Sequence, residues 1–208
     1  MAIFHRATVT PTKAELLASW APTTPWGPDA GAPIELIGSY RFDDPEGRVG
    51  METFLFTAGG RLLQAGLTYR DEPCAEAESG FVATMHHSVL GNRWVYDGVH
   101  DPRYVLMLAG VALTGQGEAL GMVVTDGRWY VAPAAVRIRG GGWTGDRVPL
   151  DGFELLSDDG QGPARLRNDG FELRLHRHPD VGPAPPIGLT ATWDGAPAPV
   201  VVADIRPL

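Results

Sequence analysis

The first half of the chain is organised as short runs in which apolar and polar residues alternate, the pattern of strands with one buried face. Segments rich in Gly, Pro and Asp separate these runs, and residues 43–47 and 59–60 have the composition of hairpin turns. The strands predicted here are Ala2 to Val9, Ile34 to Phe42, Gly50 to Thr57, Arg61 to Tyr69 and Arg93 to Asp97. Because short turns join antiparallel neighbours, we expect one curved, mainly antiparallel sheet.

A capping box predicts a short helix after the first strand. Thr12 and Glu15 are three residues apart, so each side chain can bond to the backbone amide of the other, and the helix that follows places Leu16 and Trp20 on one face. The segment after this helix is rich in proline, which predicts an irregular loop with Trp26 as its anchor.

A longer helix is predicted to begin at Asp101 and to end at Gly115. An Asp side chain can accept from the free amides of the first turn, and Pro102 at the first helical position loses no hydrogen bond. The apolar residues that follow at helical spacing are Val105, Leu108, Val111 and Ala112. We expect this helix to dock on the sheet. If Asp101 acts only as a cap, Asp101→Ala should cost about 0.5–2 kcal/mol and Asp101→Asn almost nothing.

The second half of the chain is predicted to form a series of short strands separated by Asp-Gly, Gly-Gly and Pro-Pro turns. These strands are Gly121 to Asp126, Arg128 to Pro133, Ala135 to Arg139, Phe153 to Leu156, Ala164 to Arg167, Phe171 to His176, Leu189 to Trp193 and Val200 to Ile205. A glycine-rich segment precedes them, so we expect a first domain at residues 1–118 and a β-rich region at residues 119–208, packed on the first sheet or extending it. The expected fold class is α+β: a curved, mainly antiparallel β-sheet packed on a helix, followed by a β-rich C-terminal half.

Composition limits the environment and the partners. The chain has 208 residues, of which 44% are hydrophobic and 20% charged, as expected of a globular protein with a substantial core. Its net charge of −8 opposes binding to nucleic acid or to an anionic membrane surface. Cys74 is the one cysteine, so no intramolecular disulfide can form, and no apolar run reaches membrane-spanning length. We expect a cytoplasmic protein, and nothing in the sequence calls for a cofactor.

Chemically distinctive residues are concentrated between positions 83 and 113. The candidate cluster consists of His86, His87, Arg93, Trp94, Tyr96, Asp97, His100 and Asp101. Among them, His87, Asp97 and His100 are the candidate metal ligands, because imidazole and carboxylate groups bind zinc, iron and nickel. Adjacent histidines on a strand point to opposite faces, so His86 and His87 cannot both bind one ion without a bulge. We favour a structural role for the cluster over a catalytic one.

Alternation within the central strand assigns its residues to two faces. Trp94 and Tyr96 share one face and are the natural core candidates, which leaves Arg93 and Asp97 on the other face. We expect these two charges to bridge each other or a neighbour and to brace the sheet near the predicted helix. The six tryptophans could include a sugar-stacking platform, although a core role is preferred for Trp94 and Trp193.

Three other motifs have weaker chemical interpretations. Ser88 with His87 and Asp97 suggests a nucleophile, a base and an orienting acid, but no Gly-x-Ser-x-Gly elbow surrounds the serine. Residues 140–146 lack the Gly-Lys-Ser/Thr ending of a phosphate loop and are expected to form a long turn. The histidines at positions 176 and 178 share one face of a strand and could bind a metal, but a solvated edge is the expected setting.

Three blocks of sequence carry a family resemblance. The blocks are Ala7-Thr8-Val9-Thr10-Pro11-Thr12-Lys13 with Leu16-Leu17; Gly38-Ser39-Tyr40-Arg41-Phe42-Asp43-Asp44-Pro45 with Gly50-Met51-Glu52-Thr53; and His87-Ser88-Val89-Leu90-Gly91 with Arg93-Trp94-Val95-Tyr96-Asp97-Gly98 and His100-Asp101-Pro102. In this order and with this spacing they resemble the N-terminal cap domain of actinobacterial maltokinases and related aminosugar kinases. The resemblance extends over about half of the chain, from Ile3 to Val111.

The resemblance implies a non-catalytic domain, since in the kinases this cap precedes the phosphotransfer lobes. Residues 171–179 are only weakly similar to the strand that opens a kinase small lobe. The second half has no lysine to hold nucleotide phosphates and no His-Gly-Asp type catalytic loop. We therefore expect no kinase activity and interpret the chain as a stand-alone cap-like protein without the kinase lobes.

The same resemblance implies the class of partner. It would be a protein of bacterial α-glucan, glycogen or trehalose metabolism, or a carbohydrate, and the protein would act as a binding or regulatory module. Binding is expected to use the acidic loop from Arg70 to Gly80 or the β-rich second half. The alternative function is that of a small metal-dependent hydrolase that uses the central His and Asp cluster.

Overall fold

The computed structural model describes residues 2–3 and 7–208. In chain order the elements are β1 (Ala2–Ile3), β2 (Val9–Thr10), α1 (Lys13–Trp20), η1 (Ala21–Thr23), β3 (Ile34–Phe42), β4 (Gly50–Ala58), β5 (Arg61–Arg70), η2 (Ala75–Gly80), β6 (Phe81–His87), β7 (Gly91–Asp97), η3 (Gly98–His100), α2 (Pro102–Thr114), β8 (Gly121–Thr125), β9 (Arg128–Val131), β10 (Val136–Gly140), β11 (Glu154–Ser157), β12 (Ala164–Arg167), β13 (Phe171–Val181), β14 (Gly188–Trp193) and β15 (Val200–Pro207), where η denotes a 3₁₀-helix. In this part of the chain, no helix combines the length and the apolar character needed to cross a membrane.

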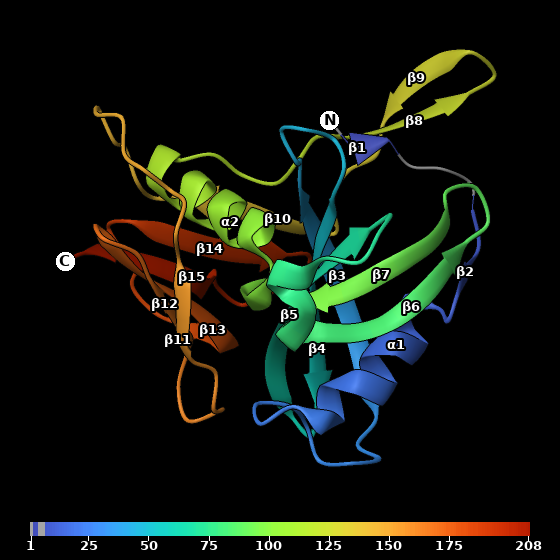
Figure 1. The fold of residues 1–208 in the computed structure, drawn as a ribbon, viewed down its shortest axis with the longest axis horizontal. Coiled ribbons are helices and arrows are strands. Elements are labelled where there is room, and N and C mark those ends of the chain that lie inside the picture. The colour runs from blue at the N-terminus through green and yellow to red at the C-terminus, as the bar shows by residue number, and fades with distance from the viewer. Residues whose placement is uncertain (1, 4–6) are drawn as a thin grey trace.

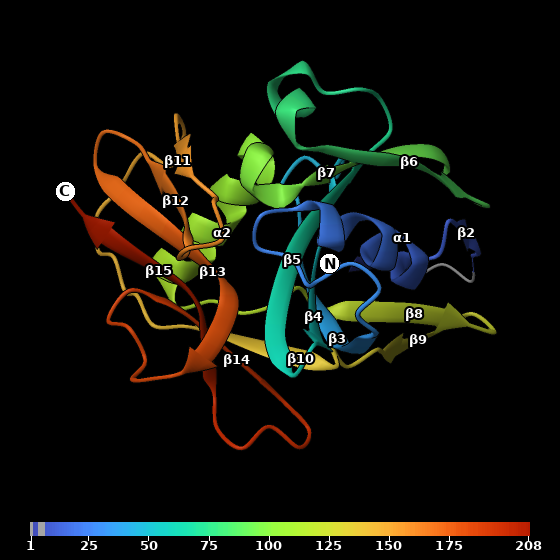
Figure 2. The ribbon, with the colours of Figure 1, turned by 90° about the horizontal axis from the view of Figure 1, so that it is seen from below.

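Most of the described chain is folded into two six-stranded antiparallel sheets. The first sheet has the strand order β2-β6-β7-β5-β4-β3 and the second has the order β10-β14-β15-β13-β12-β11, so each half of the chain supplies one sheet. The two sheets lie side by side in Figure 1 and again in the rotated view of Figure 2. Strands β8 and β9 form a hairpin that projects from the body and pairs with β1. This architecture confirms the α+β class and the β-rich second half.

Most strands predicted from alternation are present with similar bounds, but β13 continues to Val181 instead of ending at His176, and β6 was not predicted. The single strand expected from Ala2 to Val9 is wrong. Ala2–Ile3 pairs in parallel with β8, whereas Val9–Thr10 pairs with β6, and positions 4–6 lie outside the described residues. Alternation indicates that a segment is extended but not which strand it pairs with, so it could not separate these two short strands.

Helix α1 begins at the predicted capping box and closes one face of the first sheet. The Thr12 hydroxyl accepts from the amide of Glu15, and the Glu15 carboxylate accepts from the amide of Thr12. Leu16 and Leu17 are buried in a cluster with apolar residues of β4, β5, β6 and β7. Trp26, the predicted anchor of the following loop, is 2% exposed and belongs to the same cluster.

Helix α2 packs against both sheets rather than on the first sheet alone. As predicted, Asp101 caps its N-terminus and Gly115, with a φ of 68°, ends it in the left-handed conformation. Its buried residues, among them Tyr104, Leu108 and Ala112, share one core with residues of β3 and β4 and with strands β10, β14 and β15. Helical periodicity identifies the apolar face of a helix but not the sheets that the face will cover.

The glycine-rich segment after β10 completes the C-terminal end of α2. The amides of Gly142 and Thr144 donate to the carbonyl oxygens of Ala112 and Leu113, at 3.0 and 3.1 Å. A Cβ atom on Gly142 would lie 2.4 Å from the Ala112 oxygen, so this approach requires glycine. The segment is therefore a long turn that satisfies helix carbonyls.

Candidate functional site

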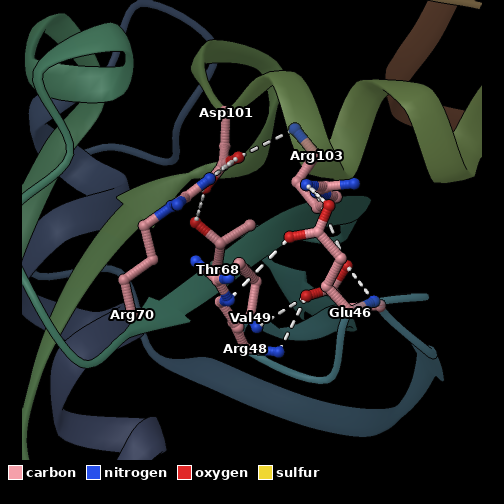
Figure 3. Close-up of polar contacts among 8 residues, drawn as sticks. Glu46, Arg48, Val49, Thr68, Arg70, Asp101 and Arg103 are labelled. Atoms are coloured by element: carbon pink, nitrogen blue, oxygen red, sulfur yellow. Dashed lines mark hydrogen bonds and ion pairs between the residues drawn. The ribbon is translucent and has the colours of Figure 1, made fainter.

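The N-terminus of α2 is held by the buried carboxylate of Asp101 (Figure 3). Its Oδ1 atom accepts from the backbone amide of Arg103 at 2.9 Å, which is the helix cap predicted from the sequence. The carboxylate also accepts two hydrogen bonds from the Arg70 guanidinium, at 2.7 and 2.8 Å, and one from the Thr68 hydroxyl at 2.7 Å. Asp101 is therefore both a helix cap and an ion-pair partner of strand β5.

Arg103, in the first turn of α2, extends this network to the turn between β3 and β4 (Figure 3). Its guanidinium donates to the Glu46 carboxylate at 2.8 Å and lies 3.5 Å from the carboxylate of Asp44. Asp44 in turn accepts from the backbone amides of Arg48 and Val49, at 2.8 and 3.0 Å. The acidic hairpin turn is thus fastened to the start of the helix.

Hydrogen bonds from neighbouring side chains lower the pKa of the Asp101 carboxyl. Burial alone would raise the pKa of this carboxyl, but the hydrogen bonds from Arg70 and Thr68 outweigh burial and hold the pKa below its usual range. Asp101 is accordingly ionised at neutral pH. An ionised carboxylate whose oxygens are all engaged by protein donors braces the structure and has no proton to donate.

A second buried ion network joins the two sheets. Arg177, on β13 of the second sheet, is 0% exposed and donates at 2.6 Å to Asp97, which ends β7 of the first sheet. It also donates to Asp158, just after β11, at 2.6 and 3.2 Å. Its guanidinium lies over the ring of Trp26, 4.3 Å from the centroid. One arginine therefore connects three segments that are distant in the sequence.

Burial and ion pairing have opposite effects on the pKa values in this second network. Burial raises the pKa of Asp97, against the opposing effect of the positive charge on Arg177. For Arg177 itself burial favours the neutral form, but the charges of Asp97 and Asp158 more than offset this, so its pKa is raised. The arginine is charged at every pH at which the protein is folded, and loss of any partner would leave a buried charge uncompensated.

Gln64 makes a further polar connection between the sheets. Its side-chain amide donates to the carbonyl oxygens of His176 and Val202, at 2.7 and 2.6 Å. These carbonyls lie where the pairing of β13 with β15 is interrupted, between Leu175 and Asp180. The inserted side chain of Gln64 therefore supplies hydrogen bonds that the strand ladder lacks at this point.

The solvated edge expected for His176 and His178 is wrong, because both residues are half-buried. The pairing of β13 with β12 ends at Leu175, but beyond it the His176 carbonyl oxygen accepts from Gln64 of the first sheet. The His176 Nε2 atom lies 2.8 Å from the Asp204 carboxylate, and the Nδ1 atom of His178 is buried. The pattern within one strand does not reveal its position in the sheet.

A pocket of about 410 Å³ opens where the loop after α1, the end of β7 and the end of β11 meet, and is named here the junction pocket. Its lining includes the aromatic residues Trp20, Trp26 and Phe81 and the polar residues Ser79, Asp97, His100 and Asp158. The rings of Trp20 and Trp26 meet edge to face at 5.4 Å, and His100 Nδ1 lies 3.0 Å from the Ser79 hydroxyl. The pocket is an open depression of the surface that brings aromatic rings and fixed polar groups together.

Five residues of the predicted cluster lie near the junction of the two sheets or behind it. Asp97 and His100 line the junction pocket. Asp101 lies at the start of α2, Tyr96 is fully buried and makes an edge-to-face contact with Phe81, and Trp94 is partly buried in β7. Only part of the cluster therefore faces a space that a ligand could enter.

The remaining three cluster residues gather at the opposite end of β7, around the β6–β7 turn. His86 Nδ1 lies 3.1 Å from the side-chain oxygen of Asn92, and His87 Nδ1 accepts from backbone amides of the turn. Arg93 donates to the carbonyl oxygen of Leu90 at 2.8 Å. Of the two bridges expected for these charges, the one between Arg93 and Asp97 is not formed, and Asp97 is instead paired with Arg177 of the second sheet.

The catalytic interpretations of this stretch find no matching geometry. Ser88 lies at the β6–β7 turn, where its hydroxyl accepts from the amide of Thr8 at 3.0 Å, whereas Asp97 is at the far end of β7, roughly 20 Å along the strand. Among the residues that the structure describes, no group of three or more His, Cys, Asp or Glu side chains is placed to hold a metal ion. The candidate ligands His87, Asp97 and His100 are not brought together.

Sequence reasoning missed Arg177, Asp158 and Gln64. One signal could have found the arginine: Leu173, Leu175 and Arg177 alternate on the buried face of β13, so a charge stands at a core position. A buried arginine requires an acidic partner, and this requirement predicts a long-range ion pair. The pattern does not say which of the acidic residues supplies it.

The fold and these networks define a class of protein, an α+β module in which buried charges fasten two antiparallel sheets together. A comparison with known protein families assigns one segment of the chain to a family. Residues 20–101 match the sequence model of the maltokinase N-terminal cap domain, which confirms the family resemblance for this segment. No curated protein matches the chain.

The matched segment covers less than half of the 208 residues. It contains strands β3 to β7 and ends at Asp101, so that α2 and the second sheet lie beyond it, and the motif block at residues 7–13 precedes it. The junction pocket takes Phe81 and Asp97 from the matched segment and Leu155 and Asp158 from the second half. The two halves thus build this pocket together.

Proposed function

We propose that this protein is a non-catalytic, cytoplasmic binding or regulatory module of bacterial α-glucan, glycogen or trehalose metabolism. The match of residues 20–101 to the maltokinase N-terminal cap domain is the observation that carries this assignment. It links the first sheet to an enzyme that is named for its action on maltose. The proposal extends that link from the matched segment to the whole chain.

The state of the central acidic residues supports a non-catalytic role. Asp101 accepts from Arg70, Thr68 and the amide of Arg103, and Asp97 is paired with Arg177. A general acid or base must be free to exchange a proton with a bound substrate. Carboxylates that are committed to internal cations in this way serve to fix the shape of the protein.

The proposed ligand is an α-linked glucose oligosaccharide in the junction pocket. An aromatic ring presents a flat apolar surface that matches the C–H face of a pyranose, and Phe81 is 45% exposed in this pocket. Asp158 and His100 are held by Arg177 and Ser79, so they can meet sugar hydroxyls without the entropic cost of being ordered by the ligand. The aromatic rings can stack on the sugar rings of such a ligand, and the pre-ordered polar groups can hydrogen-bond to its hydroxyls.

Phe81→Ala should weaken the binding of maltotriose about tenfold, which corresponds to about 1.4 kcal/mol. The substitution removes a stacking surface and leaves the polar groups of the pocket in place. Isothermal titration calorimetry on the full chain would measure the two dissociation constants.

Leu90→Ala is the matched control, because Leu90 is 48% exposed but lies at the β6–β7 turn, away from the pocket. This variant should bind maltotriose as the wild type does. The ligand assignment would be contradicted if the wild type produced no heat of binding, or if Phe81→Ala bound as tightly as the wild type.

A further inference from the structure

The outward face of the second sheet carries an excess of arginine. The arginines whose side chains point away from the core are Arg137 and Arg139 on β10, Arg165 and Arg167 on β12, Arg174 on β13 and Arg206 on β15. The acidic residues in register with them are Glu154, Glu172 and Asp204. The sign of this face is therefore opposite to the net charge of −8 of the whole chain.

The central carboxylates of this face are each shared by more than one cation. Glu172 accepts from Arg165 and Arg167, at 2.8 and 2.9 Å, and these hydrogen bonds lower the pKa of Glu172 to about 2. Asp204 accepts from Arg174 and from Arg206, and it also faces the Nε2 atom of His176. Two permanent positive charges meet each of these carboxylates, so neither Glu172 nor Asp204 leaves an unpaired negative charge on this face.

Asp204 and its partners form the polar wall of a second cleft, of about 700 Å³, which is named here the outer cleft. The loop at residues 182–187 forms another wall. The apolar lining includes Val181, Pro183, Pro185, Ile187 and Val201. Asp180 also lies in the lining, and its carboxylate accepts from the amide of Val181 at 2.7 Å. The outer cleft shares no lining residue with the junction pocket.

Arg206 and Arg174 have donors left for a ligand. The Arg206 side chain is 64% exposed, and its contact with Asp204 is a 3.3 Å hydrogen bond from Nε, so its terminal nitrogens are available. Arg174 uses Nε and one terminal nitrogen on Asp204, which leaves its other terminal nitrogen. A guanidinium group recognises carboxylates and phosphates with paired N–H donors.

We propose that the outer cleft binds a small organic anion, whose carboxylate or phosphate group pairs with Arg206 and Arg174 and whose apolar body packs against Val201 and the proline-rich loop. The arginines supply the charge recognition, and the prolines supply a wall that is already rigid before binding. This site is independent of the oligosaccharide proposed for the junction pocket.

An NMR titration of the isotope-labelled full chain with phenyl phosphate, benzoate and benzyl alcohol tests this proposal. The three probes carry the same ring, so differences among them report the acid group. Phenyl phosphate, benzoate or both should bind and shift the signals of Gly182, Val201 and Arg206, and benzyl alcohol should bind at least about tenfold more weakly. The relative affinities of the two anions would show which acid group the cleft prefers.

Arg206→Gln should weaken anion binding about five- to tenfold and leave the fold unchanged, because the side chain is largely exposed. Arg137→Gln is the matched control, since it removes the same charge from the same outward face but on the edge strand β10. The proposal fails if neither anion binds or if benzyl alcohol binds equally well. It also fails if Arg206→Gln binds as the wild type does, or if Arg137→Gln weakens binding as much as Arg206→Gln.

Discussion

Arg177→Met should lower the free energy of unfolding by about 3–5 kcal/mol. Methionine approaches the volume of arginine, but it leaves the carboxylates of Asp97 and Asp158 without their cation in the region where the two sheets meet. The stacking contact with Trp26 is lost as well. Urea denaturation of wild type and variant would give the difference directly.

Arg165→Met is the control, because it makes the same chemical change at an arginine that is exposed and paired with Glu172. Its stability should be close to that of the wild type, since exposed pairs contribute little. Adding Asp97→Asn to Arg177→Met should recover part of the loss, because it removes one of the two stranded charges. A loss for Arg177→Met no larger than that for Arg165→Met would show that the buried network does not hold the sheets together.

Asp101→Ala should lower the free energy of unfolding by about 2–4 kcal/mol, because the variant loses the helix cap and the charged hydrogen bonds from Arg70. Asp101→Asn can still cap the helix but loses the ion pair, so it should cost about 1–3 kcal/mol. The near-neutral outcome expected for Asn from capping alone is therefore revised by the position of Arg70. Arg70→Gln should match Asp101→Asn in size, and an unchanged stability in both would contradict the ion pair.

The same carboxylate makes stability depend on pH. The pKa of Asp101 is lowered from 3.8 in the folded chain, so its ionised form stabilises the fold above that value, and this contribution is lost as the pH falls through the folded pKa. The difference in unfolding free energy between wild type and Asp101→Asn should be constant near neutrality and should shrink below about pH 4. Urea denaturation of both proteins from neutral to acidic pH measures it, and a difference that did not shrink at all as the pH fell below about 4 would contradict a role for the charge.

The ends of the helices could be predicted from the sequence, because they depend on interactions between residues that are close together in the chain. The capping box at Thr12, the Asp101-Pro102 helix start and the Gly115 helix end all depend on residues a few positions apart. Alternation located most of the strands for the same reason, because it depends only on which face of a strand is buried, although it did not identify β6. The family resemblance added the cap-like segment, which the match at residues 20–101 confirms.

The polar connections between the sheets, which were not predicted, depend on long-range partners. Asp97 and Arg177 are 80 positions apart, and Gln64 reaches carbonyls 112 and 138 positions away. These partners come into contact only when the two sheets pack together, so the sequence around one residue does not reveal its partner. The same limit explains why Arg93, the nearest arginine along the strand, was named as one expected partner of Asp97, and why His176 was placed at an edge.

The most direct test of the proposed function is an NMR titration of the full chain with maltotriose, in the presence of ATP and Mg²⁺, that follows the protein and the sugar in one sample. The indole signals of Trp20 and Trp26 should shift saturably, whereas that of Trp143, which is 89% exposed and absent from the pocket lining, should not. The maltotriose should remain intact and unphosphorylated. Unchanged signals for Trp20 and Trp26, or the appearance of shorter or phosphorylated sugars, would contradict a non-catalytic oligosaccharide-binding module.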